Sequence, residues 1–269
     1  MYERTELLLG SEGVERLKSA RVAVFGVGGV GGYAVEALVR AGVGHITVVD
    51  HDTVSESNLN RQIIALRSTV GRPKVEVIRE RALDINPDID MKALNMFFLP
   101  ENADSIDFSE FDYIVDAVDT VTAKLEIIGR AQRAGVPVIS SMGTGAKLHP
   151  ELLELADIYE TDICPLAKVM RKECRKRGYA GFTCVFSRED ARKNTAGMAA
   201  QTAVMAGQTA CKTPGKWQPV VPGTVSFVPG TAGLIIAGEV VRRLAVALNV
   251  HEDNRPAAVY DAAGTPVEL

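Results

Sequence analysis

A glycine-rich loop between an apolar run and a helical segment constrains this chain more than any other feature. Residues 22–25 (VAVF) are continuously apolar, and residues 26–32 (GVGGVGG) contain five glycines. Val35, Leu38 and Val39 then recur at helical spacing. Glycines allow a tight turn from a strand into a helix, and they let backbone N–H groups approach an anion at the positive end of that helix. The pattern therefore predicts an α/β sheet that binds a nucleotide.

A second strand agrees with this fold but does not identify the ligand. Residues 46–49 (ITVV) end at Asp50, roughly twenty residues after the glycines. An acidic side chain at that place can accept hydrogen bonds from ribose hydroxyls. On these features alone, NAD binding and ATP binding both remain open.

Three polar side chains farther along favour a polyphosphate. Asn58, Arg61 and Lys74 offer an amide, a planar guanidinium and a point charge, which suit phosphates on which charge develops. Arg61 is expected at the start of a short helix. Lys74 opens the helix expected over 75–85, where a cation costs roughly 0.3–1 kcal/mol unless an anion lies beside it. A solvated surface lysine is the alternative for Lys74, but an enzyme that splits ATP between its α and β phosphates needs both the loop and this cluster.

A third strand is expected over residues 113–118, followed by Asp119 and Thr120. Acidic residues at the carboxyl ends of parallel strands face the crevice where ligands bind. Asp119 is therefore the candidate for holding Mg²⁺ that bridges the phosphates, because a hard cation prefers carboxylate and phosphate oxygens. The alternative is a capping role for the helix expected from Val121. Asp116, in the middle of the expected strand, receives no assignment.

Taken together, these motifs resemble the ubiquitin-activating-type adenylating enzymes, which make an acyl adenylate from a carboxylate and ATP. The similarity covers roughly residues 1–145 and rests on residues 21–62, on GRPKVE at 71–76 and on DAVDT at 116–120. The resemblance implies that Gly26, Gly28 and Gly31 form the nucleotide loop and that Asp50 binds the ribose. It also implies that Asn58, Arg61 and Lys74 bind the phosphates and that Asp119 is the magnesium-linked carboxylate.

One residue of the resemblance implies an assembly. Arg4, in YERTELLLG at 2–10, matches the arginine that in bacterial dimers reaches the ATP phosphates of the partner subunit. Without the resemblance, Arg4 would be a flexible terminal charge. If Arg4 acts in trans, the protein is a homodimer, and apolar surface of the C-terminal portion is expected to form part of the interface.

The cysteines argue against the branch of the superfamily that serves sulfur carriers, whose members usually hold zinc with two CxxC pairs. This chain has Cys164, Cys174, Cys184 and Cys211 and no CxxC. Their scatter fits neither a tetrahedral zinc site nor a disulfide framework, so buried thiols are expected. No motif assigns Cys211 as a nucleophile.

The second half of the chain resembles the tRNA threonylcarbamoyladenosine dehydratase family. The similarity runs through residues 116–178, 183–189 and 223–244. It implies that ATP adenylates the threonine carboxylate of the modified adenosine, after which an atom of the same side chain attacks the activated carbonyl. AMP and pyrophosphate leave, and the base loses one water overall. Residues 191–219 fit this resemblance poorly, so a lid over the site and a variable insertion both remain open.

The charge distribution bears on the tRNA. The chain has 30 basic and 34 acidic residues, hence a net charge of −4, but residues 168–193 carry a net charge of +6. A local basic surface suits contact with a phosphate backbone. The candidates are Lys168, Arg171, Lys172 and Arg175. On charge alone, a solvated face of a helix over 165–177, with Leu166, Val169 and Met170 packed inward, is the commoner explanation; the family resemblance reverses that order.

The expected fold is one doubly wound, mainly parallel, Rossmann-like α/β sheet with helices on both faces and a mixed C-terminal portion. Residues 1–150 are expected to form the ATP-binding adenylation region, and residues 151–269 the substrate-binding and dimerisation portion of the same domain. The apolar stretch 234–250 carries Glu239, Arg242 and Arg243, so it predicts a packed helix and not a membrane span. No signal peptide is evident, so a cytoplasmic location is expected.

The main prediction is therefore a tRNA dehydratase that uses ATP and Mg²⁺ as cofactors. Two other functions remain open. One is adenylation of the C-terminus of a ubiquitin-like sulfur carrier, which the missing CxxC pairs disfavour. The other is an NAD-dependent oxidoreductase, which Arg61, Lys74 and the lack of a hydride-transfer motif around the four histidines disfavour. A non-catalytic RNA-binding role would leave the phosphate-binding residues unexplained.

Overall fold

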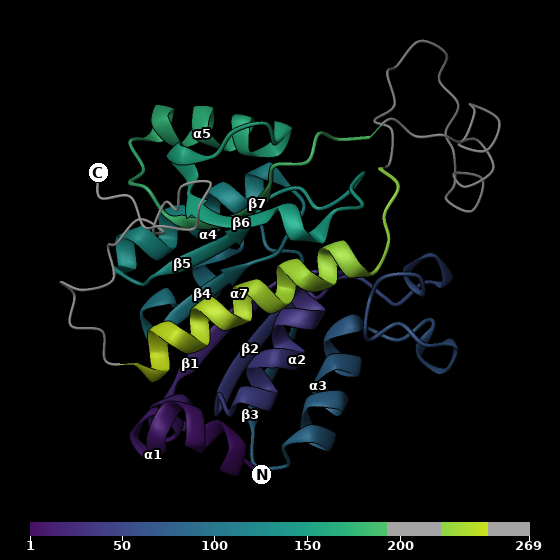
Figure 1. Ribbon diagram of the computed structural model, residues 1–269, viewed down its shortest axis with the longest axis vertical. Coiled ribbons are helices and arrows are strands. Elements are labelled where there is room, and N and C mark those ends of the chain that lie inside the picture. Colours follow the sequence, from purple (N-terminus) through teal and green to yellow (C-terminus); the bar gives the residue numbers. More distant parts are fainter. Residues whose placement is uncertain (193–221, 247–269) are drawn as a thin grey trace, which may run out of the picture.

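Seven strands form a single sheet in the computed structural model, which describes residues 1–192 and 222–246 (Figure 1). The strands are β1 Arg21–Phe25, β2 His45–Asp50, β3 Asp90–Asn95, β4 Tyr113–Asp116, β5 Val138–Ser141, β6 Leu153–Asp157 and β7 Thr183–Ser187. Their order is β3-β2-β1-β4-β5-β7-β6, and only β6 is antiparallel to its neighbour. The predicted mainly parallel α/β fold is confirmed.

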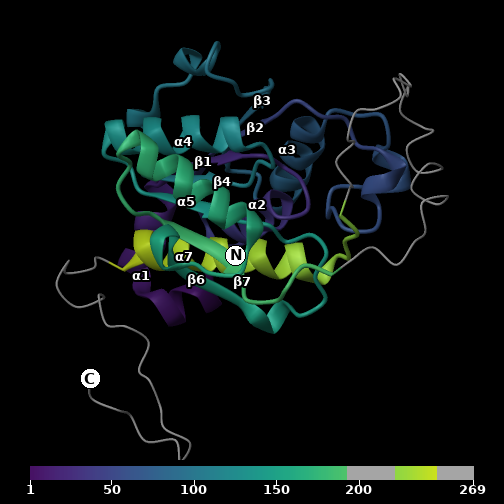
Figure 2. The same ribbon diagram turned by 90° about the horizontal axis from the view of Figure 1, so that it is seen from above.

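Helices cover both faces of the sheet, because its strands are apolar on both sides. The helices are α1 Glu3–Ser19, α2 Gly31–Ala41, α3 Lys74–Ile85, α4 Val121–Ala134, α5 Pro165–Arg177 and α7 Phe227–Ala245. Successive side chains of a strand point to opposite faces. Val22 and Val24 of β1 accordingly join the core cluster shared with α2, α3 and α7, whereas Ala23 and Phe25 join the cluster shared with α4 and α5. Figure 2 shows α7 along one side of the strands and α4 on the other.

The C-terminal portion completes the same sheet and then returns to its beginning. β6 and β7 extend the sheet beyond β5, and α7 packs on α2 and α1. The contact with α2 is close, since a Cβ on Gly233 would lie 2.3 Å from the carbonyl oxygen of Val30. The predicted packed helix is confirmed as far as Ala245, and residues 247–250 lie outside the described part. Among the described helices, none has both the length and the apolarity to cross a bilayer.

Two sequence-based expectations need correction, and a third lies outside the described residues. β4 ends at Asp116 and not at residue 118, because the Asp116 carboxylate accepts a hydrogen bond from the Val118 backbone where the chain leaves the sheet. Arg61 lies in a turn after a short 3₁₀ helix, Glu56–Asn58, and does not begin a helix. The predicted lid or insertion lies outside the described residues from position 193 onward, as does Cys211.

Candidate active site

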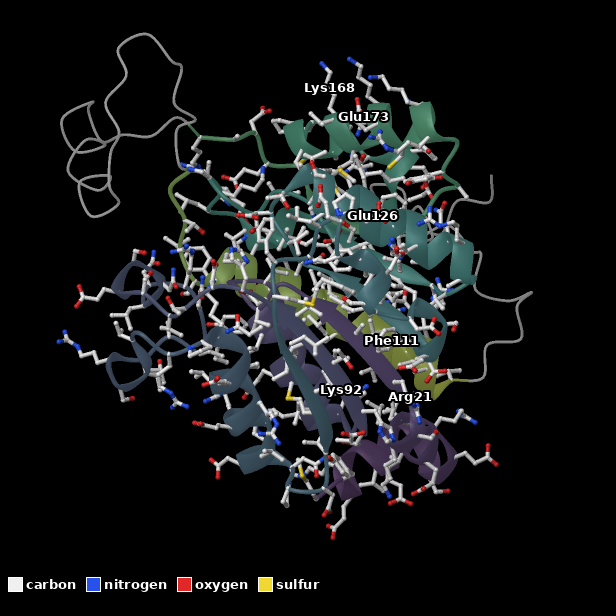
Figure 3. The ribbon with its side chains drawn as sticks, turned by 180° about the vertical axis from the view of Figure 1, so that it is seen from behind. Arg21, Lys92, Phe111, Glu126, Lys168 and Glu173 are labelled. Atoms are coloured by element: carbon white, nitrogen blue, oxygen red, sulfur yellow. The ribbon has the colours of Figure 1, made fainter. Side chains whose placement is uncertain are left out.

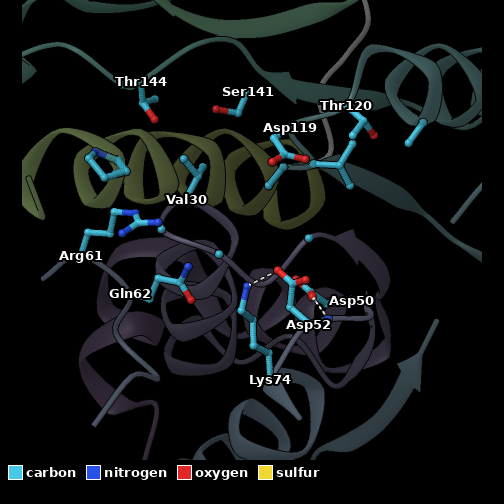
Figure 4. A pocket seen from close by; sticks show the side chains of 18 of the residues that line it. Val30, Asp50, Asp52, Arg61, Gln62, Lys74, Asp119, Thr120, Ser141 and Thr144 are labelled. Carbon is cyan, nitrogen blue, oxygen red and sulfur yellow. Dashed lines mark hydrogen bonds and ion pairs between the residues drawn. The ribbon is translucent and has the colours of Figure 1, made fainter. Parts of the chain in front are cut away.

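A pocket of about 480 Å³ lies at the carboxyl ends of the central strands. This is the usual place for a ligand in an open α/β sheet, and the volume is in the range of small-molecule sites. One wall comes from the glycine loop, the segment after β2 and Lys74. The facing wall comes from the loops after β4 and β5, with Leu166 and Pro222 from the C-terminal portion. The pocket therefore joins both parts of the chain (Figure 4).

The three predicted glycines have different reasons to be glycine. Gly26 has φ +87°, and a Cβ there would lie 2.7 Å from the carbonyl oxygen of Ala117. A Cβ on Gly31 would lie 1.8 Å from the carbonyl oxygen of Gly26. Gly28 is different, since a Cβ there would meet only Gln62 Nε2, at 3.9 Å. Backbone packing explains Gly26 and Gly31, whereas the backbone of Gly28 lines the pocket with open space beside it.

Asp50, the last residue of β2, is hydrogen-bonded to the glycine loop. Its Oδ2 accepts a hydrogen bond from the Val27 backbone at 2.7 Å, and its Oδ1 accepts one from the Asp52 backbone at 2.8 Å. A carboxylate has about four acceptor sites, so it can still accept hydrogen bonds from ribose hydroxyls. Asp50 lines the pocket, as its predicted role requires.

Lys74 is the first residue of α3, and its side chain is only 5% exposed. The alternative of a solvated surface lysine is therefore wrong. Its Nζ donates to Asp52 Oδ2 at 2.6 Å, which explains how a cation is tolerated at a helix N-terminus. Because Lys74 also lines the pocket, its ammonium group is available to a bound anion.

Arg61 and Asn58 line the same wall as Lys74. Arg61 Nη1 donates to the Ser57 carbonyl oxygen at 2.7 Å and to Asn60 Oδ1 at 3.0 Å, which holds the guanidinium in place. Burial lowers the pKa of Arg61 from its ordinary value, although an arginine remains protonated at neutral pH. Asn58 Oδ1 accepts from the Ser55 backbone at 3.1 Å, so its amide nitrogen is the group left to face a ligand.

Asp119 is exposed and lines the opposite side of the pocket. Within residues 1–192 and 222–246, it makes no side-chain hydrogen bond or ion pair. Thr120 occupies the N-cap position of α4 and makes no side-chain capping bond, so the capping alternative has no support in the geometry. A free carboxylate in a pocket suits a hard cation such as Mg²⁺. Asp50, His51 and Asp52 also cluster, but the carboxylates of the two aspartates are already engaged by backbone N–H groups and Lys74.

Arg4 is far from the pocket of its own subunit. It is exposed near the start of α1, where the neighbouring Tyr2 packs against Gly42 at the C-terminal end of α2. The pocket lies at the other end of α2, about 16 Å away for a helix of this length. Arg4 therefore does not belong to the pocket of its own chain.

The four predicted tRNA-binding residues lie on α5 and differ in their surroundings. Figure 3 shows the place of one of them, Lys168. Arg171 donates to Thr161 Oγ1, and the Arg175 guanidinium lies 5.0 Å from the centre of the Tyr159 ring. Lys168 and Lys172 are exposed, and neither side chain has a partner in the described part of the chain.

The buried face of α5 differs from the prediction. Met170 is buried and Leu166 lines the pocket, but Val169 is 45% exposed, so its predicted inward packing is wrong. Ala167 and Cys174 complete the buried face. Because Leu166 is the second residue of α5, the N-terminal end of this helix lies beside the pocket.

Two features of the site escaped the sequence analysis. Gln62 lines the pocket directly after Arg61 and is 7% exposed. Below the pocket floor, Lys124 is fully buried, and its Nζ donates to Asp116 Oδ2 at 3.0 Å and to the Ser141 carbonyl oxygen at 2.8 Å. This network joins the loop that carries Asp119 to the loop after β5. Its only signal in the sequence was a lysine in the first turn of a helix, a place where lysines are normally exposed.

Comparison with known proteins identifies the family. The model of the ThiF family matches residues 2–262. A tRNA threonylcarbamoyladenosine dehydratase of Bacillus subtilis is 41% identical over 251 residues, covering 90% of this chain and 94% of the relative. The chain belongs to the ThiF family, among its tRNA threonylcarbamoyladenosine dehydratases. The dehydratase of Escherichia coli is 35% identical over 69% of this chain.

Solved structures of the E. coli dehydratase have the same fold as this ThiF-family chain. The complex of that enzyme with ATP superposes with a TM-score of 0.77 at 29% identity, covering 90% of this chain and 93% of that one. Its complex with AMP gives a TM-score of 0.76. A molybdopterin-synthase adenylyltransferase of Salmonella typhimurium is 40% identical, but over only 52% of this chain.

Proposed function

We propose that this protein is an ATP-dependent tRNA threonylcarbamoyladenosine dehydratase. The threonine carboxylate of N6-threonylcarbamoyladenosine in tRNA attacks the α-phosphorus of ATP, and pyrophosphate leaves. An atom of the same side chain then attacks the carbonyl carbon, AMP leaves, and the ring closes. The observation that carries the proposal is the convergence of Arg61, Lys74 and Asp119 on one pocket beside the glycine loop, in a member of this family.

The residues of the first wall suit the adenylation step. Asn58, Arg61 and Lys74 would hold the polyphosphate and neutralise the charge that develops as pyrophosphate leaves. Asp119 would hold Mg²⁺, which would supply positive charge to stabilise the phosphates as pyrophosphate leaves. The glycines and Asp50 would hold the nucleotide in place.

Ring closure needs no nucleophile from the enzyme, because the attacking atom already belongs to the substrate. The cysteines agree with this proposal. Cys164, Cys174 and Cys184 are all buried, and burial raises the pKa of the Cys174 thiol to about 11 and that of Cys184 to about 12. Thiols of this kind remain protonated and poorly nucleophilic at neutral pH.

The substrate would enter from the wall made by the later part of the chain. Residues 141–145, Leu166 and Pro222 face the phosphate-binding wall across the pocket. Of these, Leu166 and Pro222 belong to the proposed substrate-binding and dimerisation portion, 151–269, whereas residues 141–145 belong to the proposed ATP-binding region, 1–150. Lys168, Arg171, Lys172 and Arg175 would contact the tRNA backbone along α5, and tRNA as the substrate implies a cytoplasmic location.

The homodimer remains a proposal that rests on the role the resemblance gives Arg4, because that residue is too far from the pocket of its own chain to fill this role there. Apolar surface suited to an interface lies nearby. Leu7 and Leu8 on α1 are 89% and 83% exposed, and Leu234 on α7 is 51% exposed. Exposed apolar side chains of this kind are a common mark of an interaction surface.

Adenylation of a ubiquitin-like sulfur carrier is the second candidate, supported by the similarity to the Salmonella adenylyltransferase over half of the chain. Among the described residues, no cluster of three or more metal-ligating side chains includes a cysteine, so the zinc site usual in that branch has no counterpart there.

The test is ATP–pyrophosphate exchange with purified protein, comparing tRNA that carries threonylcarbamoyladenosine with unmodified tRNA. Mass analysis of the nucleoside follows. Exchange with the modified tRNA alone, together with loss of one water from the base, is the expected result. Failure with both tRNAs would contradict the dehydratase proposal and favour the second candidate, in which the activated carboxylate is the C-terminus of a protein.

A further inference from the structure

The loop after β5 presents several hydrogen-bond donors to the pocket. Residues 143–145 line the pocket and are partly buried, and their backbone N–H groups have no acceptor in the described part of the chain. The Thr144 hydroxyl also has no hydrogen-bond partner among the described residues. Figure 4 shows Thr144 across the pocket from Arg61 and Lys74. These donors are therefore available to an acceptor on a bound substrate.

This loop, residues 143–145, is held at both ends. The Met142 N–H before it donates to the Val185 carbonyl oxygen at 2.8 Å, and the Ala146 N–H after it donates to the Gly223 carbonyl oxygen at 2.7 Å. Ala146 has φ +58°, a left-handed conformation that is uncommon for residues other than glycine. The donors are thus fixed before a substrate binds, which is the condition for donors that stabilise a developing charge.

The direction of the adenylation step indicates which part of the substrate meets the 143–145 loop. Under the proposed function, pyrophosphate leaves toward Arg61 and Lys74 on the first wall. The attacking and leaving oxygens at a phosphorus atom lie roughly in line, so the threonine carboxylate attacks from the opposite side. That side is the wall that carries the 143–145 loop. The carbonyl group of the adenylate would therefore lie beside this loop when ring closure begins.

We propose that the 143–145 loop is the oxyanion site of ring closure, where the Thr144 hydroxyl and the backbone N–H groups donate to the carbonyl oxygen of the adenylated threonine. The inference rests on the proposed function, since it requires the adenylate. An atom of the carbamoyl group forms a bond to the carbonyl carbon, and the electron pair of the C=O bond moves to oxygen. The C=O bond then forms again, the bond from its carbon to the AMP oxygen breaks, and AMP leaves with that electron pair. One N–H proton of the carbamoyl group is released.

Neutral donors suit the charge that this step creates. The oxyanion exists only between the attack and the departure of AMP, so donors directed at it stabilise the transition state more than the neutral carbonyl. Of the described residues that line the pocket, the lysine and the arginine are Lys74 and Arg61, and both lie on the first wall. On the facing wall, hydroxyl and backbone donors would therefore stabilise this charge.

The two halves of the reaction can be measured separately. Thr144→Val removes the hydroxyl and keeps the shape of the side chain, whereas Thr144→Ser keeps the hydroxyl. The substrates are tRNA that carries threonylcarbamoyladenosine and ATP labelled at its α-phosphorus. Pyrophosphate exchange measures adenylation, an acid quench of a single turnover measures AMP joined to tRNA, and mass analysis of the nucleoside measures ring closure.

Thr144→Val should slow ring closure by about 100-fold, the loss typical of one oxyanion donor, while pyrophosphate exchange does not fall. Labelled AMP should then accumulate on the tRNA. Thr144→Ser should restore most of the rate of ring closure. Thr122→Val is the matched control, because Thr122 is exposed on α4 and does not line the pocket, so both steps should keep their wild-type rates.

Ring closure at the wild-type rate in Thr144→Val would overturn the inference. An equal loss of exchange and of ring closure would also overturn it, because the hydroxyl would then serve substrate binding or adenylation. If the wild-type protein shows no exchange with the modified tRNA, the proposed function fails instead. Thr144→Ala gives the same comparison if thermal unfolding shows that Thr144→Val does not fold.

Discussion

A single buried lysine, Lys74, connects the sequence pattern with the proposed chemistry. Replacing it by alanine removes the cation that lies beside the phosphate-binding wall and leaves Asp52 without its 2.6 Å partner. Loss of one group that stabilises developing charge typically slows an enzyme by about 10²–10³-fold. Lys74→Ala should therefore reduce pyrophosphate exchange by at least about 100-fold, whereas tRNA binding, measured by filter binding, should stay nearly unchanged.

The control for Lys74 is Lys92→Ala. Lys92 is exposed on β3 and does not line the active-site pocket, so exchange should keep its wild-type rate. Equal loss of exchange and of tRNA binding in Lys74→Ala would contradict the separation of roles between the pocket and α5.

The buried thiol of Cys184 gives a prediction about pH. Burial raises its pKa to about 12 from an ordinary value of 9.0. In the unfolded chain the thiol loses its proton near pH 9, while in the folded protein it keeps it, so the unfolded state is favoured as the pH rises. The free energy of unfolding should fall by up to about 1.4 kcal/mol between pH 8 and pH 10 through this group.

Urea unfolding of wild type and Cys184→Ala at both pH values measures this contribution. The alanine variant is expected to be less stable at pH 8, because it leaves a cavity, but to lose less stability on going to pH 10. A fall of the same size in both proteins would show that Cys184 does not carry the effect.

At the scale of single residues, the sequence predicted site residues that belong to a recognisable motif. It did not predict site residues whose role depends on being buried by the fold. Asp50 follows a strand and Lys74 opens a helix, so their places could be inferred, and both line the pocket. Lys124 could not be found in this way. Its burial depends on Asp116 and on the Ser141 carbonyl, which only the paired strands β4 and β5 bring to the same place.

At the scale of elements, the buried pair between β4 and α4 predicts a large effect on stability. Lys124→Met leaves the Asp116 carboxylate buried without its cation, and breaking such a pair typically costs about 3–5 kcal/mol. The double variant Asp116→Asn with Lys124→Met removes both charges, so it should recover much of that loss. Urea unfolding of the singles and the double measures the coupling. Additive losses would mean that the two side chains act independently.

The element α5 carries a prediction about tRNA. On α5, Lys168 and Lys172 are exposed and have no partner among the described residues, so the variant Lys168→Ala with Lys172→Ala should weaken binding. It should also flatten the slope of the logarithm of the binding constant against the logarithm of salt concentration by about two. Lys176→Ala is the control, because Lys176 already pairs with Glu173 at 3.0 Å. An unchanged slope in the double variant would leave α5 as a solvated face.

The elements themselves were largely predictable, for a physical reason. Central strands of a parallel sheet are buried on both faces, so β1 and β2 appear as continuous apolar runs, and the helix over 165–177 was predicted with its observed bounds. Which face of α5 is buried was harder, since Leu166 and Val169 have the same apolar character. Only the packing of α5 against α4 places Val169 outside.

At the scale of the whole molecule, charge is unevenly distributed. The net charge is −4, yet residues 168–193 carry +6, and this segment begins on α5 two residues after Leu166, which lines the pocket. A generally basic protein would bind any RNA, whereas a basic surface next to the pocket on an acidic protein would favour RNA placed to reach the active site. The proposed homodimer came from the resemblance at Arg4 and not from a pattern of charge or hydrophobicity, because it depends on where Arg4 lies relative to the pocket.

Mixing two inactive variants tests that assembly. If Arg4 acts in trans, the Arg4→Ala and Lys74→Ala homodimers both lack one essential group in every site. A mixed dimer has one site with Lys74 from one subunit and Arg4 from the other, so that site is complete, while its second site lacks both. Random exchange makes half of the dimers mixed, and pyrophosphate exchange should recover to about a quarter of the wild-type level. Recovery should require subunit exchange, monitored by the mass of tagged dimers. If mixed dimers form and remain inactive, Arg4 does not act on the partner's site.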